Sequence, residues 1–118
     1  MKGESQMKEK LLMMKNKDFI YKCLEILIRD EREDDINKLT DPCFCKDKFD
    51  MYYAIIQEVS LYGEIPEKDF RDNCLNRRYY PQPVIAFGKR YIVCNDWYYK
   101  TKANNRDTRT NFVNWVLR

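Results

Sequence analysis

The sequence predicts an α+β fold in which N-terminal helices are followed by a β-hairpin or small antiparallel sheet and a C-terminal helix. Three observations indicate this class: apolar residues recur at helical spacing in the first half, two β-prone runs flank Gly88, and a capped apolar stripe ends the chain. With 118 residues, the chain is expected to form a single domain over residues 1–118. Hydrophobic residues make up 44% and charged residues 35%, which is typical of a folded protein rather than a disordered chain.

The chain begins with two helical segments. Residues 1–17 are rich in lysine and methionine and are expected to form a helical or flexible N-terminal extension. Asp18 can cap the helix that follows. The apolar stripe of that helix consists of Phe19, Ile20, Cys23, Leu24, Leu27 and Ile28. The charged run at residues 29–35 is expected to be solvated and to end this helix.

Two more helices are expected before the hairpin. Residues 46–62 place apolar side chains on one side of a helix, and Gly63 suits its stop. Pro66 favours the first position of a third helix. Glu67 and Asp69 suit the positive end of that helix's dipole.

The strongest local signal is a β-hairpin over residues 84–94. Two β-prone runs flank Gly88 and Lys89, which predicts a two-residue loop with glycine at the positive-φ position of a type II′ turn. This register pairs Phe87 with Arg90 and places Lys89 and Arg90 at an exposed tip.

The remainder of the chain accommodates one more strand and predicts a final helix. Residues 97–101 are a candidate third strand, and residues 101–106 form a polar, basic loop. Asp107 or Thr108 then caps a C-terminal helix. The apolar residues of that helix are Phe112, Val113, Trp115, Val116 and Leu117.

Charge is distributed unevenly along the chain. Residues 1–70 hold 12 Lys+Arg and 16 Asp+Glu, a net charge of −4, whereas residues 71–118 hold 10 and 3, a net charge of +7. Arginine dominates the basic part and is interleaved with aromatic residues. Arginine suits phosphates and base edges, and aromatic rings can stack on bases. The alternative interpretation is that most of the rings belong to the core and the arginines to a solvated surface. If the two parts stay separate in space, one face is basic and another acidic.

The element order over residues 46–94 resembles that of a winged helix-turn-helix domain, because a basic third helix precedes a hairpin with a basic tip. This resemblance implies that the third helix enters a DNA groove and that the hairpin contacts phosphates. It is one architecture among several that the pattern allows.

The leading hypothesis is a non-catalytic nucleic-acid-binding protein, with duplex DNA favoured, that acts as a regulator or accessory factor. The expected contact residues are Arg71, Asn73, Arg77, Arg78, Lys89, Arg90, Lys100, Lys102, Arg106 and Arg109. The alternative is a protein inhibitor or adaptor, such as a phage-encoded, anti-CRISPR-like antagonist of a host nucleic-acid-processing protein. The short, glycine-poor, Lys/Asn/Tyr-rich sequence suits a phage or mobile-element product. A homodimer is compatible with either hypothesis.

The sequence argues against most catalytic and cofactor classes. It has no histidine, which excludes Ser-His-Asp, Cys-His and His-metal arrangements. Its three glycines form no dinucleotide-binding or phosphate-binding loop. An arginine, lysine and tyrosine ribonuclease remains conceivable, but no nucleophile–base pair is fixed. We therefore expect no enzyme activity and no cofactor.

Five cysteines provide no convincing metal or disulfide framework. They are Cys23, Cys43, Cys45, Cys74 and Cys94. The odd number prevents complete internal pairing, and the only close pair has one residue between its members, which differs from the usual zinc spacing. Packed, reduced thiols are therefore favoured over a metal site. No apolar stretch approaches the roughly 18 residues of a membrane span, so we expect a cytoplasmic protein with no membrane contact.

Overall fold

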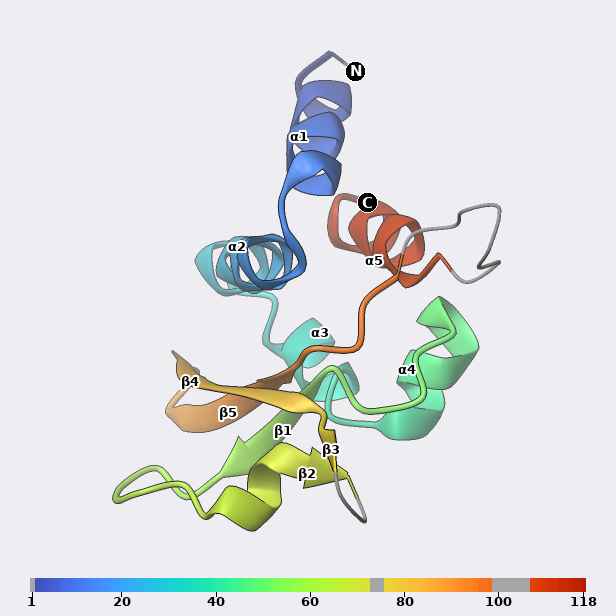
Figure 1. Cartoon of the computed structure of the whole chain (residues 1–118). Coiled ribbons are helices and arrows are strands. Elements are labelled where there is room, and N and C mark those ends of the chain that lie inside the picture. Colours follow the sequence, from blue (N-terminus) through green and yellow to red (C-terminus); the bar gives the residue numbers. More distant parts are fainter. Residues whose placement is uncertain (1, 73–75, 99–106) are drawn as a thin grey trace.

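The computed structural model describes residues 2–72, 76–98 and 107–118 of the chain (Figure 1). Its helices are α1 (Lys2–Met13), α2 (Asn16–Arg29), α3 (Glu33–Lys38), α4 (Pro42–Phe49), the single 3-10 turn η1 (Glu67–Phe70) and α5 (Thr108–Val116). Its strands are β1 (Ile56–Val59), β2 (Arg71–Asp72), β3 (Asn76–Arg77), β4 (Tyr79–Ala86) and β5 (Lys89–Cys94). The predicted α+β class, with N-terminal helices, a small antiparallel sheet and a C-terminal helix, is confirmed.

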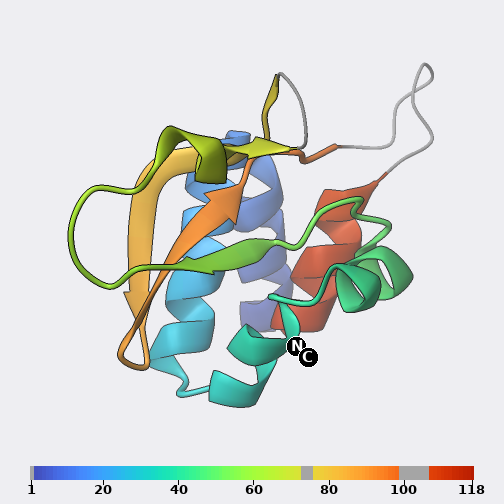
Figure 2. The ribbon, with the colours of Figure 1, turned by 90° about the horizontal axis from the view of Figure 1, so that it is seen from below.

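The main sheet is antiparallel, with the strand order β1-β5-β4. Figure 1 shows α1, α2 and α5 on one side of this sheet and η1, β2 and β3 on the other. Figure 2, seen from below, places the three strands in front of α2. The separate pair β2-β3 lies beside η1. None of the helices in the described ranges is long and apolar enough to cross a membrane.

Helix α2 confirms the predicted amphipathic helix, with small differences at its ends. The expected stripe is buried except for Ile28, which is partly buried, and Ile26 joins it. The helix begins at Asn16, so Asp18 lies in the first turn rather than at the cap. There its carboxylate suits the positive end of the helix dipole. The charged run is not a simple solvated segment, because its second half starts α3 at Glu33.

The helix expected over residues 46–62 is wrong. Helix α4 begins earlier, where the Asp41 side chain accepts a hydrogen bond from Cys43 N at 2.9 Å. It ends at Phe49, because the next residue, Asp50, has a left-handed φ of 61° that breaks the helical path. Residues 56–59 instead form β1, which pairs with β5.

The helix expected from Pro66 is also wrong. The Pro66 carbonyl accepts a hydrogen bond from Asp69 N at 3.0 Å, but only the single turn η1 forms. The chain then extends into β2 at Arg71. Within residues 46–94, the hairpin is therefore the feature of the winged-helix pattern that the described structure contains.

The hairpin over residues 84–94 is confirmed, but its turn lies one residue earlier than expected, so each paired residue near the turn has a partner two positions away from the expected one. Strands β4 and β5 pair Ala86 with Lys89, so that the loop is Phe87-Gly88 rather than Gly88-Lys89. Both loop residues have positive φ, 52° and 77°, which defines a type I′ turn and not type II′. Consequently Arg90 pairs with Ile85, not with Phe87.

The third strand of the sheet is β1, not the expected segment at residues 97–101. Residues 97 and 98 form no strand, and the remainder of that segment lies outside the described residues. The C-terminal helix is confirmed as α5. Asp107 is its cap, because its side chain accepts a hydrogen bond from Thr110 N at 3.0 Å.

The core contains a cluster of aromatic rings between α2, α4 and α5. Phe112 lies at its centre, with ring centroids 5.2 Å from those of Phe49 and Trp97 and 6.3 Å from that of Phe19. The contacts of Phe112 with Phe49 and Phe19 are edge-to-face and that with Trp97 is tilted, and such ring contacts add to the free energy gained from burying the rings. Trp97 and Phe112 of the basic half are buried in this cluster, and Tyr91 is buried elsewhere in the core, in β5. For these rings the core interpretation holds.

Candidate functional site

Four of the expected contact residues lie at least partly on the surface, and each is engaged within the chain. Arg77 Nη2 lies 3.3 Å from Glu67 Oε1, and Lys89 Nζ lies 3.9 Å from Glu58 Oε1. The two remaining residues, Arg78 and Arg90, are partly buried and are held by neutral groups: Arg78 Nε donates to Tyr53 Oη at 2.9 Å, and Arg90 Nη2 donates to Gly63 O at 2.8 Å.

Arg109 was expected to contact a ligand, but it is only 3% exposed. Its Nη2 donates to the carbonyl oxygens of Leu11, Leu12 and Met14, and its Nη1 donates to Asn16 Oδ1. These carbonyls belong to the C-terminal end of α1, which carries partial negative charge and lacks helical partners. Arg109 therefore joins α1 to α5 and is corrected from a contact residue to a structural one.

The other expected contact residues cannot be assigned to a binding site from the structure. Arg71 lies in β2. Asn73, Lys100, Lys102 and Arg106 lie outside the described residues.

The acidic and basic parts of the sequence meet in space within the described residues. Glu67 and Glu58 belong to the acidic part, and each pairs with a cation of the basic part. Near the C-terminus, Arg118 Nη2 lies 3.3 Å from Asp35 Oδ1. These three ion pairs connect the two parts, so the unequal charge along the sequence does not become two separated faces there.

An exposed apolar patch lies at the hairpin end of the sheet. Val84 lines a groove with residues of α2, so Ile85, the next residue of β4, faces the opposite side of the sheet. The strand register places Arg90 beside Ile85 and Val59 beside Arg90, all on this side. Because Arg90 donates to Gly63 O, it also holds the loop that follows β1.

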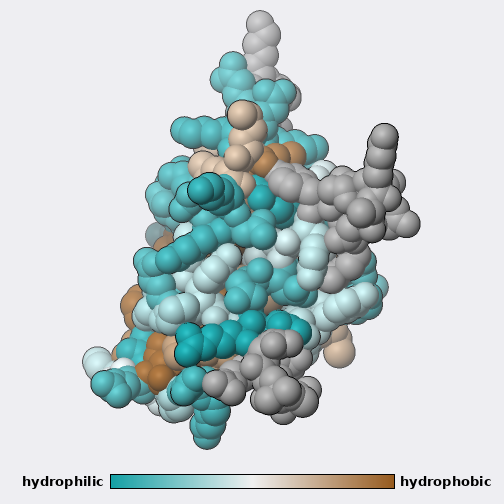
Figure 3. All heavy atoms as spheres, in the orientation of Figure 1, coloured by the Kyte–Doolittle hydropathy of each residue, from teal (hydrophilic) through white to brown (hydrophobic). Residues whose placement is uncertain are grey.

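We call Val59, Leu61, Tyr62, Ile85 and Arg90 the tip patch. Tyr62 is 83% exposed, Ile85 56% and Leu61 37%, and all three rank among the exposed large hydrophobic residues. Figure 3 shows hydrophobic atoms gathered at the lower left, over the β1–η1 loop, on an otherwise mostly hydrophilic face. Arg90 Nε has less than 1 Å² of exposed area and no hydrogen-bond partner among the described residues.

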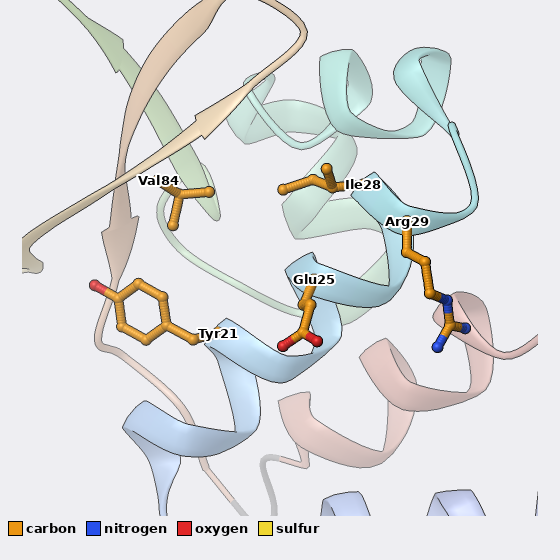
Figure 4. Close-up of a pocket in the computed structure, with 5 residues that line it drawn as sticks. All are labelled: Tyr21, Glu25, Ile28, Arg29 and Val84. Atoms are coloured by element: carbon orange, nitrogen blue, oxygen red, sulfur yellow. The ribbon is translucent and has the colours of Figure 1, made fainter.

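A groove of about 350 Å³ lies on the other side of β4, between this strand and α2 (Figure 4). Its lining residues are Tyr21, Glu25, Ile28, Arg29 and Val84. The Tyr21 hydroxyl donates to Gln82 O at 2.6 Å. Burial, with a smaller effect of Tyr80, raises the pKa of Tyr21 to about 12, so the hydroxyl keeps its proton. Tyr21 thus fixes β4 against α2 and leaves an apolar wall beside the groove.

The described cysteines differ sharply in accessibility. Cys23, Cys45 and Cys94 are buried, and burial raises the pKa of these thiols to about 12, 11 and 12. Cys43 is exposed near the start of α4. Within the described ranges, no three Cys, Asp or Glu side chains are grouped closely enough to hold a metal ion.

This difference predicts selective thiol reactivity. In a Cys74→Ser variant, which removes the cysteine outside the described residues, DTNB at pH 8 is expected to titrate one thiol within seconds. The other three thiols should react only after denaturant is added, because they are buried and protonated. A Cys43→Ser change should remove the fast phase. A second fast thiol in the native protein would mean that the core opens near α2, α4 or β5.

Comparison with known protein families, curated proteins and solved structures finds no significant match for this chain. Sequence reasoning did not identify the tip patch, although one signal was available: in a hairpin with one covered face, alternate residues point outward, which marks Ile85 once the register is known. No sequence signal indicates that Arg90, the partner of Ile85, also holds the loop that carries Leu61 and Tyr62.

Proposed function

We propose that this chain is a non-catalytic protein-binding module, an inhibitor or adaptor that contacts its partner through the tip patch. The observation that supports this proposal is the exposure of Leu61, Tyr62 and Ile85 around Arg90, at one end of the molecule. Four of the cations that suggested a nucleic-acid surface, Arg77, Arg78, Lys89 and Arg90, are engaged by groups of the chain itself. Binding phosphates would require Arg78 and Arg90 to leave their partly buried contacts, whereas the exposed ion pairs of Arg77 and Lys89 are weak and would cost little to break.

The composition of the tip patch suits a protein interface. Tyrosine and arginine are enriched at the centres of protein–protein interfaces and among the residues that dominate binding energy. Tyr62 offers a large ring with little conformational entropy to lose, and Ile85 offers an aliphatic surface on the same side of the sheet, next to Arg90. Arg90 is already fixed by its hydrogen bond to Gly63, so little further ordering is needed on binding.

Nucleic-acid binding is the second candidate function. Residues 99–106 carry Lys100, Lys102 and Arg106 without any acidic residue, which gives this segment a net charge of +3. Such a segment can contact phosphates in a salt-dependent way. We combine the two candidates in one biological setting: a cytoplasmic, phage- or mobile-element-encoded antagonist of a nucleic-acid-processing protein.

A capture experiment tests the proposed function. The immobilised chain and its Tyr62→Ala variant are incubated with extract of the source cells at 50 mM and 500 mM NaCl, and bound proteins and nucleic acids are identified. We expect one protein to bind the native chain at both salt concentrations, and its recovery to fall at least about tenfold with Tyr62→Ala, the effect of losing a dominant interface residue. Tyr62 is too exposed for this change to disturb the fold.

The matched control is Met13→Ala. Met13 is also strongly exposed but lies in α1, away from the sheet, so its loss should leave recovery unchanged. If the bait recovers nucleic acid at low salt only, and Tyr62→Ala changes nothing, the second candidate replaces the first.

A further inference from the structure

We infer that the partner binds as an added strand: an extended segment of a protein pairs with the free edge of β4 at Ile85 and lays a lysine or arginine side chain over the groove beside α2. This inference deepens the proposed function and rests on it. It specifies what the tip patch recognises, namely a peptide backbone together with side chains on both of its faces.

The free edge of β4 exposes backbone hydrogen-bonding groups at Ile85. In the order β1-β5-β4, β4 pairs with β5 on one side, and no other strand of the described residues pairs with its second side. Cys94 N donates to Ile55 O of the segment leading into β1, at 2.8 Å, so alternate residues of β5, including Arg90, direct their backbone groups toward β1. Arg90 and Ile85 are therefore a non-hydrogen-bonded pair, and the N–H and C=O of Ile85 point away from β5.

The neighbouring part of the same edge is closed to pairing. Pro81 and Pro83 have no N–H, and the Gln82 carbonyl already accepts the Tyr21 hydroxyl. The strand also bulges between Tyr80 and Val84. Prolines and bulges are the features that protect edge strands from unspecific association. In β4 they leave the backbone N–H and C=O of Ile85 as the groups that a bound strand can pair with. A bound strand is therefore restricted to one register.

A strand placed at Ile85 would find a binding surface on each face. Its residue opposite Ile85 would lie on the tip patch, and the residues before and after it would lie on the side of Val84, over the groove. Figure 2 shows β4 at the outer side of the sheet with the β1–η1 loop, which carries Leu61 and Tyr62, arcing beyond it. Backbone pairing gives affinity in this mode, and surfaces for alternate side chains give specificity.

The groove favours an aliphatic stem that ends in a positive charge. In Figure 4, Val84 and Ile28 face each other across it, with the Tyr21 ring below Val84. Glu25 brings the negative charge: its side chain is exposed, and its pairing with Lys22 at 3.2 Å is exposed and therefore weak. Arg29 is paired with Asp30 at 3.1 Å and points away from Val84. Glu25 is therefore the charged side chain closer to Val84 and to the groove.

The test uses a phage-displayed library of random 12-residue peptides selected on the native chain. We expect enriched peptides to alternate apolar residues with a lysine or arginine. In a synthetic copy, N-methylation of the backbone amide that pairs with Ile85 C=O should weaken binding at least about tenfold. Methylation of the next amide, which faces away from β4, should change it little.

Two protein variants complete the test. Ile85→Pro removes the N–H and should abolish peptide binding, whereas Ile85→Val keeps it and should bind within about threefold of the native chain. Proline is tolerated here because this N–H faces solvent, and circular dichroism verifies the fold. Glu25→Gln should lower the affinity of the lysine peptide several-fold and leave a leucine-substituted peptide unaffected.

Failure of this inference is distinguishable from failure of the proposed function. If Tyr62→Ala releases a captured protein but no peptide is enriched, or methylation at both amides has equal effects, strand addition is wrong and the patch binds a folded surface instead. If peptides bind but Glu25→Gln does not discriminate between lysine and leucine, the assignment of a basic side chain to the groove is overturned.

Discussion

Replacing Arg109 with methionine is expected to lower the free energy of unfolding by about 3–5 kcal/mol, because several hydrogen bonds from a buried charged group are lost and each contributes roughly 1.5–3 kcal/mol. Its guanidinium binds three carbonyl oxygens at the end of α1 and the side chain of Asn16. It also lies 4.3 Å from the centroid of the Phe19 ring. Methionine fills the volume but donates no hydrogen bond, so the carbonyls at the end of α1 lose their partner.

Urea unfolding followed by circular dichroism measures this loss, with Arg77→Met as the matched control. Arg77 is exposed and makes a single ion pair with Glu67, so its replacement should cost less than about 1 kcal/mol. Arg109→Lys should be nearly as harmful as Arg109→Met, because one ammonium cannot reproduce the planar array of donors. Equal stability of the Arg109 and Arg77 variants would show that α1 does not depend on this contact.

Local sequence patterns correctly predicted those helices and strands that keep one residue pattern and pack on the same surface along their whole length. The stripe of α2 has a strict helical period and packs on one core, and the hairpin has β-prone runs on both sides of a glycine. The turn shifted because Phe87 adopts a φ of 52°, a conformation that residues other than glycine rarely adopt. Nothing in the local sequence favours Phe87 over Lys89 for that position.

The segment between α4 and β1 could not be predicted from spacing alone. Tyr52, Tyr53, Ile56 and Val59 fit one face of a helix, but a strand can use the same residues. The decision depends on Asp50, which leaves the helical region, and on the pairing of β1 with β5, a contact that is distant in sequence. Single-sequence periodicity does not report such a contact.

The candidate site was harder to predict than the fold, because charge counts along a chain do not tell which acid meets which base. The cations of residues 71–118 were expected to contact phosphates. Lys89, however, lies near Glu58 because β1 pairs with β5. Arg109 stands in a polar stretch that resembles a surface loop, and only the packing of α1 on α5 reveals its burial. Both outcomes depend on tertiary contacts between remote elements.

Replacing Asp35 with asparagine is expected to lower the free energy of unfolding at pH 7 by about 2–3 kcal/mol, since charge-assisted hydrogen bonds in a mostly buried site are lost. The Asp35 side chain is 12% exposed and lies 2.7 Å from Arg32 and 3.3 Å from Arg118. Arg32 in turn donates to the carbonyls of Trp115 and Val116 at the end of α5. The carboxylate therefore holds an arginine that caps a helix.

The loss of stability caused by Asp35→Asn should become smaller as the pH falls. Burial alone acts to raise the pKa of Asp35, but hydrogen bonds and charge from Arg32 and Arg118 outweigh it and lower the pKa below its usual value. A carboxyl whose pKa is depressed by folding stabilises the protein fully above its unfolded pKa of about 3.9. That contribution is lost as the pH falls through the lower, folded value.

Urea unfolding at a series of pH values therefore distinguishes this network from a merely steric role. The difference between native protein and Asp35→Asn should stay constant from pH 7 to about 5 and shrink as the pH falls below about 4. Asp34→Asn serves as the control, because Asp34 is exposed on the same helix and should show a small difference throughout. A difference for Asp35→Asn that persists unchanged to pH 2 would mean that the shape of the side chain, rather than its charge, holds α3 to the end of α5.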